Sequence, residues 1–175
     1  MSRVQVSLLG ALILISFVLT CIATLSGYWI TWATSSSNME TVHGHFGVVP
    51  WSLHDTGLFN AACWCIFVAV LLYLPLFVLF IFSAFKVFRN GCSHGVRMHF
   101  FAILVMCLMI ASLQVATFIL VAINAARNSF SYIVYSHTYT VKESLGYASF
   151  IAVVSGVLMA FATVLAGNIA KRHCR

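Results

Sequence analysis

The sequence has very few charged residues. Asp, Glu, Lys and Arg together make up 7% of its 175 residues, whereas they account for roughly a quarter of a soluble domain. Hydrophobic residues make up 62%, and the mean hydropathy is +1.04. An ordinary soluble domain is therefore excluded, and the length suits about four membrane spans with short connections.

Charged residues are absent from the middle of every long apolar run. Transporters, pumps and intramembrane enzymes usually place ionisable groups inside the membrane, because these groups move protons and ions or act as nucleophiles. We therefore expect a protein that is not an enzyme and that has no cofactor and no metal site.

Four apolar runs, at about 4–27, 57–88, 99–126 and 145–170, have the length of transmembrane helices. A secretory signal is the alternative for the first run, but its apolar stretch is longer than the about 7 to 15 residues of a signal core. It also ends in Tyr28 and Trp29, which are typical of a membrane interface. We predict an all-α membrane protein, a single four-transmembrane-helix bundle over residues 1–175, with outer loops at 28–56 and 127–144.

The basic residues predict the orientation of this bundle. Of the nine Lys and Arg residues, two lie in the second outer loop, and seven lie near the N-terminus, the middle loop or the C-terminus. The seven are Arg3, Lys86, Arg89, Arg97, Lys171, Arg172 and Arg175. Because basic residues favour the cytoplasmic side, we expect a multi-pass plasma-membrane protein with both termini in the cytoplasm. The same clustering beside apolar runs argues against nucleic acid as a partner, despite the net charge of +6.

Both outer loops contain segments typical of β-strands. Residues 129–141 are dense in aromatic and β-branched side chains, and residues 28–34 and 46–53 are similar. Between the last two segments, residues 33–47 contain Ser35, Ser36, Ser37, Asn38 and Gly44 and are predicted to form a loop. We therefore predict a small extracellular β-sheet of three strands formed by the two outer loops. Its candidate interaction surface consists of Trp29, Trp32, Trp51, Tyr132 and Tyr135.

Small residues recur every four positions in the last apolar run. They are Ala148, Ala152, Gly156 and Ala160, and this spacing places them along one helix face that another helix can approach closely. The face either packs inside the bundle or docks the transmembrane helix of a partner, with lipid as the alternative occupant. Ser16, Thr20 and Gln114 predict interhelical hydrogen bonds within the bundle.

Two cysteines lie in basic segments next to the membrane. Cys92 follows the second apolar run, and Cys174 follows the fourth. S-acylation occurs in such settings, so lipidation and an unmodified thiol are both open for these residues. His43, His45 and His54 cluster in the first outer loop, and we interpret them as surface residues.

Several sequence features are shared with a known family. Trp29 or Trp32 lies near the outer end of the first span, Val49-Pro50-Trp51 follows at the spacing of a Gly-Leu-Trp motif, and Gly146-Tyr147-Ala148-Ser149 opens the last span. With the four-span layout, these features resemble the claudin, epithelial membrane protein and peripheral myelin protein superfamily. The disulfide of that family's first outer loop has no counterpart here, because His54 occupies the first cysteine position. The resemblance therefore implies a divergent claudin-like member.

The resemblance implies two alternative functions. The protein is either a lateral accessory subunit that regulates a channel or receptor in the same membrane, or a cell contact or paracellular barrier protein. The short first outer loop favours the first hypothesis. The partners implied are membrane lipid, together with another integral membrane protein or like molecules.

The orientation is tested by cysteine-accessibility labelling in intact cells. We expect an impermeant thiol reagent to label a cysteine introduced at Ser131 in the second outer loop, and to label one introduced at Arg172 only after permeabilisation. Labelling of position 172 in intact cells would contradict a cytoplasmic C-terminus.

Overall fold

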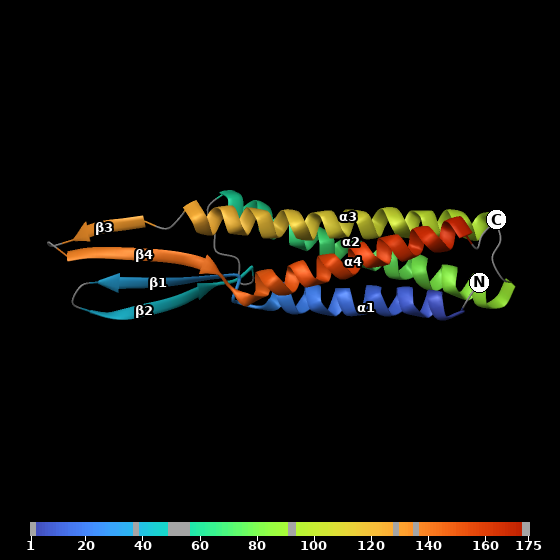
Figure 1. Ribbon diagram of the computed structural model, residues 1–175, viewed down its shortest axis with the longest axis horizontal. Helices are drawn as coiled ribbons and strands as arrows, with labels where there is room; N and C mark the ends of the chain where they lie inside the picture. The colour runs from blue at the N-terminus through green and yellow to red at the C-terminus, as the bar shows by residue number, and fades with distance from the viewer. Residues whose placement is uncertain are drawn as a thin grey trace.

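In the computed structural model, the chain forms a helix bundle with a sheet at one end (Figure 1). The structure describes residues 3–36, 39–48, 57–90, 94–127, 130–134 and 137–172. Within these residues the helices are α1 (Arg3–Leu25), α2 (Gly57–Asn90), α3 (His94–Arg127) and α4 (Tyr147–Arg172). The start of α1 and the end of α4 both lie at the end of the bundle opposite the sheet (Figure 1).

All four helices are long and apolar enough to cross a membrane. α2 and α3 have 34 residues each. At 1.5 Å per residue they are roughly 50 Å long, so they extend beyond a hydrocarbon core of about 30 Å. α3 starts at His94, before the predicted start at residue 99, because the helix continues past the apolar run that was used to predict the span. α2 continues through Pro75.

The sheet is antiparallel and joins the two outer loops. It contains β1 (Ile30–Ser36), β2 (Met39–Phe46), β3 (Phe130–Val134) and β4 (His137–Leu145), in the order β2-β1-β4-β3. The central pair, β1 and β4, brings together segments that are more than a hundred residues apart, with Trp32 opposite Glu143. β2 and β3 form the two edges of the sheet.

The predicted sheet of the two outer loops is confirmed, but the predicted number of strands is wrong. Among the described residues the sheet has four strands, because the second outer loop forms the two strands β3 and β4 instead of one long strand. β2 lies within 33–47, which we predicted to be a loop, because pairing with β1 holds its Gly and His residues extended. The rest of the strand predicted at 46–53 lies mostly outside the described residues.

Glycines allow the sheet to sit directly on the ends of the helices. A Cβ added to Gly47 would lie 2.5 Å from the Cα of Gly27, so these two backbone segments touch. A Cβ added to Gly146 would overlap the carbonyl group of Tyr28. Larger residues at Gly47 and Gly146 would therefore separate the sheet from the bundle.

A hydrogen-bonded cluster connects all four helices in the interior of the bundle. Its members are Ser16 and Thr20 of α1, Tyr73 of α2, Gln114 of α3 and Ser155 of α4, and all are fully buried. The hydroxyl groups of Ser16 and Tyr73 are 2.6 Å apart, and those of Ser16 and Ser155 are 2.7 Å apart. The Gln114 amide donates to Thr20 at 2.7 Å and to Ser155 at 3.0 Å. The hydroxyl groups and the Gln114 amide N–H therefore find partners within the bundle, where a membrane offers no water. The Oε1 atom of Gln114 is buried and has no hydrogen-bond partner among the described residues.

Ser155→Ala tests the contribution of this cluster. The substitution removes the hydroxyl that bonds to α1 and α3, so we expect the free energy of unfolding in lipid–detergent micelles to fall by about 1 to 2 kcal/mol. Ser112→Ala is the matched control, because the exposed Ser112 hydroxyl bonds only to the Met109 carbonyl of its own helix. We expect it to change stability by less than about 0.5 kcal/mol. Equal effects of the two substitutions would contradict a stabilising role for the cluster.

Candidate functional site

Trp29 lies between the sheet and the helices and has no exposed surface. Its indole Nε1–H donates to the Ala23 carbonyl at 2.7 Å, near the end of α1. The prediction that Trp29 belongs to the interaction surface is therefore wrong. The physical reason is that the chain turns directly after Tyr28, so the next side chain packs into the outer end of the bundle.

The backbone of Trp29 joins elements from both outer loops. Its N–H donates to the Phe46 carbonyl at 2.9 Å, and its carbonyl accepts the Gly146 N–H, also at 2.9 Å. The Ser149 hydroxyl donates to the same carbonyl at 3.3 Å. The indole and these bonds together connect α1, the end of β2 and the start of α4, so Trp29 anchors the sheet.

Trp32 is half-buried and lies across the edge strand β2. Its indole occupies the position that a Cβ on Gly44, its partner in the β1–β2 pair, would need. The indole also lies near Phe46, with the ring centroids 6.3 Å apart. Phe46 is 43% exposed, so Trp32 and Phe46 present aromatic surface beside the β2 edge.

A second aromatic group lies where the sheet meets the helices. The rings of Tyr28 and His45 stack with centroids 4.0 Å apart, and Tyr28 also stacks with Tyr147 at 5.2 Å. A depression of about 250 Å³ beside the β2 edge is lined by Tyr28, Thr31, Trp32, His43, Gly44 and His45. We call this depression, together with Phe46 and Tyr147, the β2-edge surface. Tyr28, His45 and Tyr147 were not among the predicted surface residues. His45 lies in β2, which was predicted to be a loop, and only the pairing of β2 with β1 brings it against Tyr28.

The other predicted surface residues are only partly described. Tyr132 lies in β3, opposite Tyr139 of β4. Trp51 and Tyr135 lie outside the described residues, as do Cys92 and Cys174. Their predicted roles in the interaction surface and in lipidation remain predictions. Among the described residues, no group of three or more His, Cys, Asp and Glu side chains is arranged to hold a metal ion.

The small residues of α4 are divided between two faces of the helix. Ala148, Ala152 and Gly156 are buried, whereas Ala160 is exposed. Four residues turn a helix by 400°, so a four-residue repeat drifts by roughly 40° at each step. By Ala160, this drift has moved the repeat out of the buried face.

Gly156 makes room for a side chain of the same bundle. A Cβ added to Gly156 would lie 3.3 Å from the Oε1 atom and 3.4 Å from the Cβ atom of Gln114 on α3. α4 therefore uses this face for packing within the bundle. A partner that approaches α4 has to contact its other faces.

A family model described as "Tight junction protein, Claudin-like" matches residues 1–175. The chain belongs to this claudin-like family. No curated protein matches the chain. The four apolar helices identify this claudin-like protein as a multi-pass membrane protein in contact with lipid. Proteins of the claudin-like family are typically not enzymes.

The role of Gly156 is tested by comparing Gly156→Leu with Ala160→Leu. At position 156 the leucine would collide with Gln114, so we expect the free energy of unfolding to fall by about 1 to 3 kcal/mol or the protein to misfold. The same residue at position 160 points out of the bundle, so we expect normal stability. Thermal unfolding in detergent measures both. Similar melting of the two variants would show that Gly156 is not a tight packing site.

Proposed function

We propose that this claudin-like protein is a non-enzymatic accessory subunit that binds a channel or receptor side by side in the plasma membrane. The β2-edge surface is the proposed binding surface. The observation that supports this proposal most directly is the direction of the strands, which run along the same axis as the helices (Figure 1).

The strand direction determines which partners can reach an edge of the sheet. Because the helices cross the membrane, edges parallel to them point along the membrane normal. A strand or loop that pairs with β2 must then lie beside the sheet, as in a protein embedded in the same membrane. An exposed edge strand offers backbone hydrogen bonds to such a partner.

The composition of β2 also suits binding. Edge strands are commonly protected against pairing by Lys or Pro residues. β2 has the sequence METVHGHF, which contains neither, and Glu40 near its beginning is its one charged residue. The aromatic side chains beside it, Trp32 and Phe46, belong to the residue types that are enriched at protein interfaces.

The proposed orientation places the sheet outside the cell. α1 begins and α4 ends at the opposite end of the bundle (Figure 1). Arg89, Arg97 and Lys171 also lie in the helix ends on that side, which suits the cytoplasm because basic residues favour that side.

A role in cell–cell contact is the second candidate. The description of the matching family as tight junction proteins favours it. The sheet also projects beyond the helices (Figure 1). In this role the partner approaches the tip of the sheet from the opposite cell, whereas a lateral partner approaches the β2 edge.

Site-specific photo-crosslinking distinguishes the two candidates. A photoreactive residue replaces His43, which is exposed on β2, or Phe161, which is exposed on α4. We expect position 43 to yield an adduct with another membrane protein, in equal amounts from isolated cells and from cells in contact. Position 161 should not yield that adduct. An adduct that forms only between cells in contact would replace the accessory proposal with the contact role.

A second variant tests whether the β2-edge surface has to be intact. In Gly44→Val the new side chain overlaps the Trp32 indole, so we expect the position 43 adduct to be lost. Gly95→Ala is the control, because a Cβ there meets nothing within 4 Å. An undiminished adduct in a well-folded Gly44→Val variant would contradict this binding surface.

A further inference from the structure

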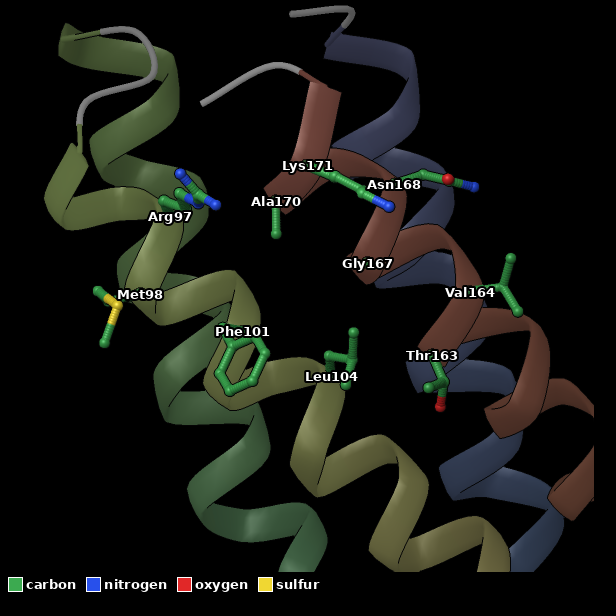
Figure 2. Close-up of a pocket in the computed structure, with 10 residues that line it drawn as sticks. All are labelled: Arg97, Met98, Phe101, Leu104, Thr163, Val164, Gly167, Asn168, Ala170 and Lys171. Carbon is green, nitrogen blue, oxygen red and sulfur yellow. The ribbon is translucent and has the colours of Figure 1, made fainter. Parts of the chain in front are cut away.

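A groove lies between the beginning of α3 and the end of α4 (Figure 2), which are at the end of the bundle away from the sheet (Figure 1). Its volume is about 780 Å³, within the range of about 300 to 1,000 Å³ that is typical of ligand sites. This groove plays no part in the β2-edge surface. An inference about its occupant is therefore independent of the proposed function.

The wall of the groove is apolar over most of its length. Phe101 and Leu104 of α3 lie along one side, and Val164 of α4 belongs to the other (Figure 2). The helices come close at Gly167, where an added Cβ would lie 3.0 Å from Leu104 Cδ1. Phe101 and Val164 are mostly exposed, so within a membrane this side of the groove faces lipid chains.

Two basic residues from different helices lie at the end of the groove that is farthest from the sheet. Arg97 is at the beginning of α3 and Lys171 is near the end of α4 (Figure 2). Both are exposed. The three acidic residues of the chain, Glu40, Asp55 and Glu143, all belong to the outer loops. Glu40 lies in β2 and Glu143 in β4, at the other end of the bundle (Figure 1), so among the described residues no Asp or Glu is near enough to neutralise the two cations.

We propose that the groove binds an anionic phospholipid. The phosphate and headgroup lie between Arg97 and Lys171, and an acyl chain lies along Phe101, Leu104 and Val164. Basic pockets between transmembrane helices are suited to acidic headgroups, and anionic lipids are concentrated in the cytoplasmic leaflet. This leaflet is the one that the basic residues predict for this end of the bundle.

A transmembrane helix is a poorer occupant of the same groove. An apolar helix would pack against the walls of the groove. It would also shield Arg97 and Lys171 from water without providing a counter-ion, and burying an unpaired charge is costly. A phospholipid provides both an apolar chain and an anion at the matching positions.

Native mass spectrometry with defined lipids tests the proposal. The purified full-length protein is titrated with dioleoyl phosphatidylserine or dioleoyl phosphatidylcholine, and the fraction with one bound lipid is measured. The test variant is Arg97→Gln with Lys171→Gln. The control is Lys86→Gln with Arg89→Gln, which removes the same charge from α2 at the same end of the bundle.

We expect phosphatidylserine to bind more tightly than phosphatidylcholine. The Arg97/Lys171 variant should bind phosphatidylserine about 10- to 30-fold more weakly, since each basic residue near the membrane surface contributes about 1 kcal/mol. The control pair should retain tight binding. A charge-conserving Arg97→Lys and Lys171→Arg variant should also retain it, and provides the comparison if the neutral variant folds poorly.

Four results would overturn the proposal. Three of them are equal binding of the two lipids to the unmodified protein, equal losses in the test and control variants, and displacement of phosphatidylserine by inorganic phosphate alone. The last result would identify a site for a small anion and not for a lipid. A co-purifying protein helix that occupies the groove and excludes phosphatidylserine would also contradict it.

Discussion

The packing of Trp29 at the outer end of the bundle is the interaction on which the outer sheet depends. The indole bonds to the end of α1, and the backbone of the same residue bonds to β2 and to the start of α4. The outer loops contain no cysteine, so no disulfide can hold the sheet together. Close backbone contacts at Gly47 and Gly146 provide further attachment, because neither residue has a Cβ to separate the layers. The sheet is therefore held by tight contact with the helices and by its own ladder of hydrogen bonds.

The membrane imposes a second constraint on the same chain. Hydroxyl and amide groups are buried in the bundle, where the hydroxyls of Ser16, Tyr73 and Ser155 and the amide N–H of Gln114 bond to one another, while large apolar side chains cover the outside. The helix surfaces that face lipid are apolar, and an apolar surface gives little specificity for one partner over another. Recognition is therefore expected at the two ends of the molecule, where polar and aromatic side chains gather. One end has the β2-edge surface, and the other has the basic groove between α3 and α4.

Much of this fold follows from patterns in the sequence, because uninterrupted apolar runs leave few alternatives to membrane helices. Side-chain placement within the elements was harder to predict. Trp29 looked like a surface residue because aromatic residues collect at membrane interfaces, yet one turn of the chain buries it. β2 was missed because Gly44 and His45 have weak strand preferences, which pairing with β1 overrides. Gln114 was recognised as a bundle residue, but its partners Tyr73 and Ser155 were not, since only the packing of four helices brings them together.

Hydrogen exchange of the Trp29→Ala variant tests most directly whether the helices hold the sheet through this residue. The control is Phe161→Ala, which removes an aromatic ring that is 60% exposed on α4. Exchange is followed by mass spectrometry in lipid nanodiscs, separately for peptides from β1 and β4 and from the middle of the helices. We predict that Trp29→Ala removes the protection of the β1 and β4 amides while the helix amides stay protected, and that Phe161→Ala changes neither. Unchanged protection of β1 and β4 in Trp29→Ala would contradict the account.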